Sequence, residues 1–440
     1  MKENVNHIVP DTWCVERLGD FVISEKGKKP KNISKVKTKT HHLPYVNIQA
    51  FEKNIVQEYT DGIGCVLCEE NDFLMVWDGS RSGYIGKAIK GALGSTLVKI
   101  NFPGIVNDYA YYFLLSKYLQ INTRAKGTGT PHVDPGLLWN YRFPIAPYNE
   151  QKRIVEKIEE LFSDLEKGIE YLESTEKQLN VYRQAVLKFT FEGGNVNRTK
   201  YMLKDVSAKI QIGPFGTQLH KEDYIEGGIP LINPMHIENG KIVADNSYSI
   251  TTTKRDSLPN YIMQVGDVIM GRRGEMGRCG LVTEKEKGWF CATGSLFIRP
   301  KKELIDSKFL YYFLTGDTTK KYLEENAGGT TMANLNLKIV NNIPAVIPSI
   351  KEQRQIVLEV ESRLSVCDKI EEMIEESLKQ AEALRYSILK KAFEGRLVPQ
   401  DPDDEPAGIL LQRIKAEKEK NKLVKNGIRA QSRTKQKEKA

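Results

Sequence analysis

The chain has 440 residues, more than one ordinary hydrophobic core accommodates, so we expect two or three folded units. Hydrophobic residues make up 40% of it, and no apolar run approaches the roughly 18 residues of a membrane helix, which argues against a membrane protein. The opening residues MKENVNHIVPDTW lack the apolar stretch of a signal peptide, so the expected location is the cytoplasm. Of the six cysteines only Cys65 and Cys68 have C-x-x-C spacing, and we interpret all six as reduced thiols rather than zinc ligands.

The net charge of +8 is unevenly distributed. Residues 411–440 hold eleven Lys and Arg against three Asp and Glu, so residues 1–410 sum to zero. Segments 150–192 and 352–394 are acidic, each with seven basic and ten acidic residues, whereas segments 1–149 and 193–351 together carry +9. Basic character therefore lies outside the two acidic segments, and the bulk charge alone identifies no partner.

Residues 1–148 are predicted to form a first globular domain. Apolar or β-branched runs such as FLMVW and STLVKI alternate with glycine-rich turns, and the amphipathic pattern DYAYYFLLSKYL follows them. This mixture of short strands and one helix indicates an α+β unit.

Residues 149–194 are predicted to form a long central spacer helix, because the stretch lacks proline and ends at Gly193. Apolar residues recur every seven positions, which is typical of a coiled-coil seam. Gly168 and Thr175 are poor seam residues, and they would allow close helix approach or admit a helix of a partner. The main seam consists of Ile158, Leu165, Leu172, Leu179 and Val186.

Residues 195–349 are predicted to form a second α+β domain that loosely repeats the first. LPYVNI (43–48) resembles IPLINP (229–234), and NDFLMVWDG (71–79) resembles GDVIMGRRG (266–274). YYFLL and RFPIAP likewise have counterparts in YYFLT and NIPAVIP, and one amphipathic helix is expected over SKFLYYFLTGDTTKKYL. The offset drifts between matches, as expected if loops vary on a shared scaffold.

Residues 350–396 are predicted to form a distal spacer helix that repeats the central one. A shift of 202 positions aligns Glu150 with Glu352 and Phe191 with Phe393 without a gap. Because neither apolar seam can remain exposed to water, we predict that the two helices, each about 43 residues and roughly 65 Å long, pair as an antiparallel coiled coil. The alternative is that each helix packs on its own neighbouring domain. The second seam consists of Val360, Cys367, Ile374, Ala381 and Ile388, with Leu384 in the companion phase.

Residues 397–440 are predicted to form a C-terminal tail with a basic end. LLQRIKAEKEKNKLV has the pattern of a helix, and the last residues are interpreted as a solvated end, with contact to DNA phosphates as the alternative.

Catalytic motifs are missing from the sequence. It contains no G-x-x-x-x-G-K-[ST] phosphate loop, no strand–G-x-G-x-x-G–helix unit and no Asn/Asp-Pro-Pro-aromatic motif of amino-methyltransferases. No histidine has a partner four residues away for a metal, and a nuclease-like match of Asp267 with EKEK (284–287) is of the kind that charged turns produce by chance. We therefore expect no catalytic residue, no metal and no cofactor in this chain.

Glycine-rich loops with cations and amides recur at matching places in both domains, and this recurrence favours DNA binding over ordinary solvated turns. Glycine lets backbone N–H groups approach phosphate, Arg can bond guanine through two atoms, and Asn or Gln can do so with adenine. GRRGEMGR (271–278) is the strongest stretch, because its arginines crowd one expected hairpin. The candidate DNA-binding residues are Lys28, Lys29, Ser80, Arg81, Tyr84, Lys126, Thr128, Thr130 and His132 in the first domain, and Thr217, Gln218, Lys221, Arg272, Arg273, Arg278, Thr330, Thr331 and Asn334 in the second.

Nearly the whole chain resembles the specificity subunit of type I restriction–modification enzymes. The resemblance rests on the helix openings PYNEQKRIV (147–155) and PSIKEQRQIV (348–357), the loops GTGTPH and GGTTMANLN, the stretch GDVIMGRRGEMG, and the ending LKKAFEGRLVPQDPDDEPAGILL (389–411). It implies that each domain reads one half of a bipartite site in double-stranded DNA, while the paired helices set the gap.

The resemblance also implies partners and their cofactors. The helices would dock two methyltransferase subunits, which bind S-adenosylmethionine and methylate adenine N6, and two restriction subunits would use ATP and Mg²⁺. Three alternatives remain: a non-catalytic coiled-coil adaptor of another DNA-defence complex, a stand-alone DNA enzyme with an unrecognised site, and the same fold in a modification-only complex.

Overall fold

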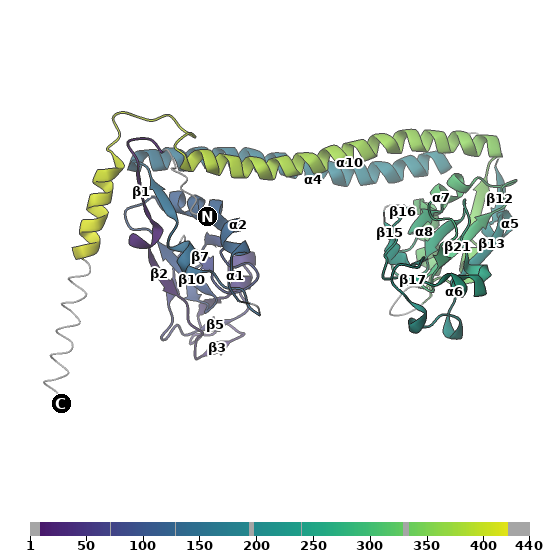
Figure 1. Ribbon diagram of the computed structural model, residues 1–440, viewed down its shortest axis with the longest axis horizontal. Coiled ribbons are helices and arrows are strands. Elements are labelled where there is room, and N and C mark those ends of the chain that lie inside the picture. Colours follow the sequence, from purple (N-terminus) through teal and green to yellow (C-terminus); the bar gives the residue numbers. More distant parts are fainter. Residues whose placement is uncertain are drawn as a thin grey trace. The chain divides into compact units, whose positions relative to one another are not determined.

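The computed structural model describes residues 9–70, 72–127, 129–192, 198–238, 240–328 and 334–420. The chain divides into two compact units, one formed by Met1–Glu170 with Leu378–Ala440 and the other by Tyr171–Ser377. Each unit combines a mixed domain of helices and sheets with parts of two long helices, α4 (Tyr148–Glu192) and α10 (Ile350–Phe393) (Figure 1). The expected fold class, two repeated α+β domains with a pair of long helices, is confirmed.

The first domain is built on two sheets that share a hydrophobic core. One is an antiparallel four-stranded sheet, whose third strand, β7 (Phe73–Val76), is buried along its whole length. Its strand order is β2 (Ile23–Lys26), β10 (Leu97–Asn101), β7 and β8 (Ile85–Lys87). The other sheet has the order β3 (Ile33–Ser34), β5 (Tyr59–Thr60), β4 (Leu43–Val46), β9 (Gly91–Leu93) and β6 (Leu67–Cys68), with β4 and β9 parallel.

Helices and a short strand pair complete the first domain. The helix expected from DYAYYFLLSKYL is α2 (Asn107–Thr123), whose Tyr109, Phe113 and Leu114 are buried. The smaller elements are α1 (Ile48–Lys53), α3 (Pro135–Leu138) and the antiparallel pair of β1 (Cys14–Arg17) and β11 (Arg142–Ile145), which leads directly into α4.

The second domain repeats this plan. Its four-stranded sheet has the order β13 (Ser207–Ile212), β21 (Ser295–Pro300), β18 (Val268–Gly271) and β19 (Cys279–Leu281). A three-stranded sheet follows the order β17 (Ser249–Ile250), β14 (Ile229–Ile232) and β20 (Phe290–Cys291), again with one parallel pair, β14 with β20. The pair of β12 (Thr199–Met202) and β22 (Pro344–Ile347) precedes α10, and the remaining elements are β15 (Ile237–Glu238), β16 (Lys241–Ile242), α5 (Leu203–Val206), α6 (Thr252–Ser257) and α9 (Leu337–Asn341).

One predicted helix is divided in two. The stretch SKFLYYFLTGDTTKKYL forms α7 (Ser307–Thr315) and α8 (Asp317–Asn326), because Gly316 adopts an extended conformation (φ −71°, ψ 151°) between them. The expectation of one continuous helix was therefore wrong, and the loss of helix at a glycine agrees with the low helix propensity of that residue.

The repeated Glu-Gln pair at the start of each long helix has a structural role. The side chain of Gln151 is buried, accepts a hydrogen bond from the Val106 N–H (2.9 Å) and donates one to the Ala146 carbonyl (2.8 Å). Gln353, also buried, accepts from the Asp306 N–H (2.8 Å) and donates to the carbonyls of Leu304 and Pro348 (2.9 Å each). Each glutamine thus ties the start of its long helix to the segment just before α2 or α7.

The two long helices contact each other within each unit. In the first unit, the Arg385 guanidinium on α10 lies 3.0 Å from the Glu166 carboxylate on α4, and Ile158 and Ile388 belong to one hydrophobic cluster. In the second unit, Arg183 on α4 pairs with Asp368 (2.7 Å) and with Glu371 of α10. These pairings require antiparallel helices, as predicted.

The long helices also pack on the domains, which was the alternative interpretation. Ile154 and Phe162 of α4, together with Leu389 and Phe393 of α10, join the core of the first domain. In the second unit, Val357 of α10 joins the core of the domain that precedes it. Helix pairing and helix–domain packing therefore coexist.

Most predicted seam residues are shielded from solvent, but Gly168 and Leu384 are exposed. Leu165 and Leu172 are half-buried, whereas Leu384, expected in the companion phase, is 51% exposed and does not belong to the seam. The buried seam residues are Ile158, Leu179, Val186, Val360, Cys367, Ile374, Ala381 and Ile388.

The C-terminal segment, residues 396–420, packs on the first domain. Residues 407–420 are helical, and Leu410, Leu411 and Ile414 belong to the core of that domain. The segment is also held by the Ala407 N–H, which donates to the Thr12 carbonyl (2.9 Å). Residues 421–440, which carry most of the expected basic end, lie outside the described residues.

Candidate nucleic-acid interface

Three loops of the first domain meet beyond one end of its four-stranded sheet. The turn after β2 is anchored by the Gly27 N–H, which donates to the Leu97 carbonyl (3.0 Å). The turn after β7 is joined to the segment 126–133, because the Gly79 N–H donates to the Pro131 carbonyl (2.7 Å) and Asp78 forms a β-bridge with His132. The described loop residues expected to bind DNA in this domain are carried by these turns.

The second domain has the same arrangement of loops. The Gly213 N–H, after β13, donates to the Ser295 carbonyl, and the Arg272 N–H, after β18, donates to the Gly294 carbonyl (3.0 Å each). Arg273 forms a β-bridge with Asn334, as Asp78 does with His132 in the first domain. We call this set of matched backbone contacts the loop frame.

Glycine is required at one matched position of the loop frame. A Cβ atom at Gly27 would collide with the carbonyl oxygen of Gly94, and one at Gly213 would collide with that of Ala292. The backbone therefore approaches the neighbouring turn more closely than any side chain permits. Both loops leave their strands in the same way for this reason.

The side chains at matched positions of the loop frame differ between the two domains. The first domain has Asp78 and His132 where the second has Arg273 and Asn334. A common backbone with different side chains can present different hydrogen-bond donors and acceptors to one class of ligand.

The candidate residues of the first domain fall into exposed and internally bound groups. Lys126 forms an ion pair with Asp134 (2.9 Å), and His132 is half-buried beside it. Thr128 lies outside the described residues. The exposed candidates without an ion pair among the described residues are Lys28, Lys29, Ser80 and Thr130.

Arg81 is held within the first domain. Its guanidinium lies 2.8 Å from the Glu52 carboxylate and 4.0 Å from the centre of the Tyr84 ring. Tyr84 packs edge-on against Phe51 and Tyr118, so its ring is part of an aromatic cluster. The expected hydrogen bonds from Arg81 to bases would require its release from Glu52.

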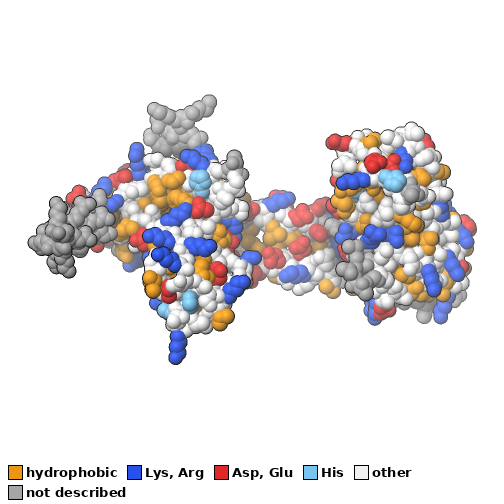
Figure 2. Space-filling view, turned by 90° about the horizontal axis from the view of Figure 1, so that it is seen from below, with side chains coloured by type: hydrophobic (Ala, Val, Ile, Leu, Met, Phe, Trp, Pro, Cys, Tyr) orange, Lys and Arg blue, Asp and Glu red, His pale blue; other side chains and the backbone are white. Residues whose placement is uncertain are grey.

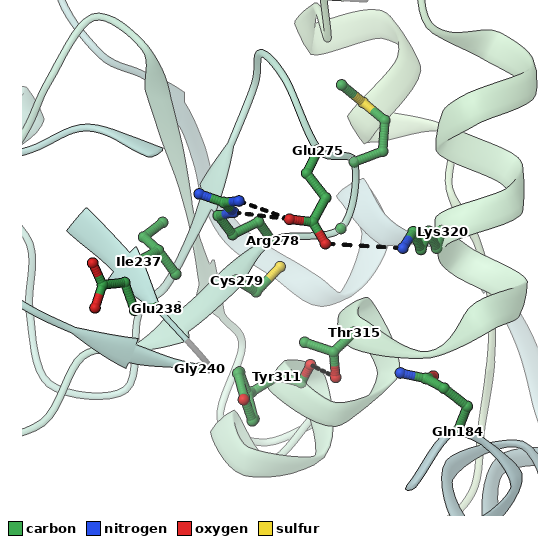
Figure 3. Close-up of a pocket in the computed structure, with 12 residues that line it drawn as sticks. Gln184, Ile237, Glu238, Gly240, Glu275, Arg278, Cys279, Tyr311, Thr315 and Lys320 are labelled. Atoms are coloured by element: carbon green, nitrogen blue, oxygen red, sulfur yellow. Dashed lines mark hydrogen bonds and ion pairs between the residues drawn. The ribbon is translucent and has the colours of Figure 1, made fainter. Parts of the chain in front are cut away.

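The three arginines of the hairpin between β18 and β19 have different surroundings. Arg278 donates to the Glu275 carboxylate (2.7 Å) and to the Pro234 carbonyl (3.3 Å), and Lys320 lies 4.0 Å from the same carboxylate (Figure 3). Hydrogen bonding to Arg278 lowers the pKa of Glu275, which keeps this group ionised. Glu275, Arg278 and Lys320 line a cavity of about 470 Å³. Because Arg278 bonds to groups of its own domain, it supports the hairpin.

Arg272 is also engaged, whereas Arg273 is not. The Arg272 Nε donates to the Leu335 carbonyl (3.2 Å), and burial together with the nearby charge of Arg273 lowers the pKa of Arg272. Arg273 is exposed and makes no ion pair or side-chain hydrogen bond with any described residue. Of the three predicted arginines, Arg273 is therefore the one whose whole guanidinium is available to a ligand.

The other candidates of the second domain are partly described. Lys221 is exposed, and the exposed Gln218 accepts a hydrogen bond from the Tyr261 hydroxyl (2.6 Å). Thr330, Thr331 and the side chain of Thr217 lie outside what the structure describes.

On each domain, the face that points away from the long helices carries scattered Lys and Arg side chains with hydrophobic side chains between them (Figure 2).

Comparison with known proteins identifies the family. A family model described as the type I restriction modification DNA specificity domain matches residues 10–173 and again residues 195–380. The chain belongs to this family.

Relatives from two organisms match this chain over most of its length. It is 26% identical to the type I restriction enzyme MjaVIII specificity subunit of Methanocaldococcus jannaschii, over 88% of this chain and 94% of the relative. It is 25% identical to the type I restriction enzyme EcoBI specificity subunit of Escherichia coli, over 95% of each.

Solved structures share its fold. The HsdS subunit from Thermoanaerobacter tengcongensis superposes with a TM-score of 0.51 and 18% identity, covering 88% of this chain and 98% of that one. A chain from a structure on complex assembly and conformational transition of the type I R-M system gives a TM-score of 0.70 at 18% identity, covering 88% and 99%.

Several structural features of this chain were not predicted from its sequence. Glu275 is the centre of the Arg278 and Lys320 contacts, and a hairpin carboxylate three residues before an arginine was the signal for it. The exposed Phe215 and Met235 were not considered, although Phe215 lies in the loop IGPFGTQLHK (212–221), which carries the predicted residues Thr217, Gln218 and Lys221.

The described parts of the chain contain no cluster of side chains suited to hold a metal ion. Within residues 9–420, gaps excepted, no three His, Cys, Asp or Glu side chains are grouped to hold a metal ion. Cys68, Cys279, Cys291 and Cys367 are buried free thiols, and burial raises the pKa of each. Among the described helices, none is both long and apolar enough to cross a bilayer.

Proposed function

We propose that this chain is the DNA sequence-specificity subunit of a type I restriction–modification complex, in which each domain reads one half of a bipartite site in double-stranded DNA. The observation that carries this proposal is the loop frame, which occurs in both domains with different side chains at matched positions. A shared backbone would dock in the same way on two stretches of duplex, and the different side chains would select different bases.

Arg273 is the best candidate for direct base reading in the second domain. It is exposed, has no ion-pair partner among the described residues, and is bridged through its backbone to Asn334. A guanidinium held in this way can bond both O6 and N7 of guanine. Arg278 would shape the loop rather than read bases, because its Nε, Nη1 and Nη2 donors are all used within the domain, and Arg272 is held through its Nε.

The complex we propose also contains partners. The helices α4 and α10 would dock two methyltransferase subunits that bind S-adenosylmethionine and methylate adenine N6. Two restriction subunits that use ATP and Mg²⁺ would complete the assembly. This chain would itself be non-catalytic, which distinguishes the proposal from a stand-alone DNA enzyme.

Selection from a random pool of duplex DNA tests the proposal. The chain, co-purified with its methyltransferase, should enrich a motif of two specified parts separated by unspecified bases. Arg273→Ala should relax one part only and weaken binding roughly 5- to 150-fold, the effect of about 1–3 kcal/mol for a two-bond contact to guanine.

The matched control is Lys302→Ala, which removes an exposed cation just beyond the opposite end of β21. It should leave the motif unchanged, and circular dichroism should show both variants folded. Enrichment of no motif would favour the adaptor, and DNA methylation or cleavage by the purified chain alone would favour the enzyme.

A further inference from the structure

Two large apolar side chains of the second domain are exposed beside the loop frame. Phe215 is 66% exposed and Met235 is 55% exposed. Exposing a ring or a thioether in this way is unfavourable in water. No aromatic ring among the described residues packs against Phe215.

Phe215 is presented by a loop that is anchored on both sides. Before it, the Gly213 N–H donates to the Ser295 carbonyl (3.0 Å), and Pro214 is buried. After it, Leu219 is buried in a hydrophobic cluster with Phe290. The ring is therefore at the tip of a fixed loop.

Met235 is held next to the arginine hairpin. The Asn233 side-chain oxygen accepts a hydrogen bond from the Gly294 N–H (3.3 Å), and the Pro234 carbonyl accepts one from Arg278 (3.3 Å). Gly294 also accepts from the Arg272 N–H, and its neighbour Ser295 accepts from Gly213. The loops of Phe215, Met235 and Arg273 are thus all tied to the turn at 294–295.

The first domain has polar residues at the matched positions. Alignment of the glycine turns places Lys29 opposite Phe215, and alignment of β4 with β14 places Gln49 opposite Met235. Both Lys29 and Gln49 are exposed. A surface that docked two copies of one protein partner would carry the same groups on both domains, so the apolar pair serves something that only the second domain contacts.

We propose that Phe215 and Met235 contact thymine 5-methyl groups in the major groove of the half-site read by the second domain. Thymine offers the apolar group on the major-groove edge of DNA, and apolar side chains recognise it by contact. Arg273 on the adjoining loop, which pairs with no described side chain, provides the positive charge that favours nucleic acid over an apolar protein surface. This inference rests on the proposed function.

Replacement of thymine by uracil tests the inference, because uracil lacks only the methyl group. Duplexes carrying the selected motif are made with uracil at one thymine position at a time and titrated with the methyltransferase complex. The wild type should bind roughly fourfold more weakly at one or two positions of one half-site, the effect of one methyl group. At each such position, the substitution that removes the contacting side chain, Phe215→Ala or Met235→Ala, should make the complex bind the thymine and uracil duplexes equally.

Matched controls separate this inference from the proposed function. Val346→Ala, which shortens an exposed side chain on β22, should keep the wild-type response to uracil. Selective binding of the motif with no response to uracil, or a half-site without an A·T pair, would overturn the thymine contacts and leave the proposed function intact. Weaker binding by Phe215→Ala together with reduced DNA bending and no response to uracil would assign the ring to a wedge between bases, which also overturns the inference.

Discussion

Glu150 and Glu352 occupy matched positions in the two long helices but have opposite electrostatic surroundings. Glu150 is 1% exposed, and its carboxylate accepts hydrogen bonds from Trp13 Nε1 (3.0 Å) and Gln400 Nε2 (2.6 Å). Burial raises its pKa above 4.5. Glu352 accepts from the hydroxyl (2.6 Å) and the N–H (3.0 Å) of Ser349, and these bonds lower its pKa below 4.5.

These shifts predict opposite pH dependences. A raised pKa means that the folded state holds the proton more tightly, so the contribution of Glu150 is present below pH 4.5 and is lost as the pH rises through the raised value. The contribution of Glu352 is present above pH 4.5 and is lost as the pH falls through the lowered value. We expect Glu150→Gln to reduce the loss of stability that the first unit shows as the pH rises. We expect Glu352→Gln to lower the stability of the second unit at neutral pH.

Amide hydrogen exchange measured below and above pH 4.5 follows each unit separately. Changes of the same sign in both variants would contradict the assignment of desolvation to one carboxylate and hydrogen bonding to the other.

At the residue scale, the loops could be located from the sequence. Which of their side chains are held within the domain and which are free for a ligand could not. The recurrence of glycine and cations predicted a hairpin at 271–278, which β18 and β19 form, yet it treated Arg272, Arg273 and Arg278 alike. Which of them is free depends on Glu275, Pro234 and Leu335, and two of these lie far away in the sequence. A single sequence contains no signal for such long-range pairs.

At the scale of elements, the long helices were predicted well because a heptad repeat and the absence of proline are local signals. Near the end of α10, however, Leu384 was placed in the seam and is exposed instead. There the helix packs on the core of the first domain through Leu389, Ala392 and Phe393 as well as on α4. An apolar stripe that faces a domain follows the ordinary helical period rather than the heptad, which leaves Leu384 outside it.

Ile388 and Leu384 provide a test of this packing within one helical turn. Ile388 is 5% exposed and Leu384 is 51% exposed. Ile388→Ala should lower the free energy of unfolding of the first unit by about 2–4 kcal/mol, the usual loss for a buried aliphatic side chain, whereas Leu384→Ala should change it by less than about 0.5 kcal/mol. Urea denaturation measures both, and equal losses would show that the observed phase of α10 is wrong.

The organisation of the whole molecule was predictable from the internal repeat, since two copies of one pattern imply two similar domains. The C-terminal segment was not, because nothing repeats it. Residues after 396 were expected to be a tail, yet Arg153 pairs with Asp404 (2.6 Å), and Ile414 fills the space above Gly104, whose φ is +77°. These contacts close the core of the first unit with residues from the other end of the chain.

Truncation tests the role of that segment. A chain ending at residue 406 loses Leu410, Leu411 and Ile414 from the core, at about 1.5–3 kcal/mol for each buried side chain. We expect its first unit to exchange amide hydrogens much faster while the second unit is unchanged. A chain ending at residue 420 is the control and should match the full chain. Equal protection in both truncated chains would show that the segment contributes no stability.

The most direct test of the central claim is a map of N6-methyladenine across the source genome, made with this gene intact, deleted, or carrying Arg273→Ala. We expect one bipartite motif, two specified parts around a gap, to lose methylation on deletion. In the Arg273→Ala strain methylation should spread to sites that differ in one part of the motif only. If methylation is the same in all three strains while the partner methyltransferase is present, the chain does not direct methylation by reading DNA, and the account given for its two domains is contradicted.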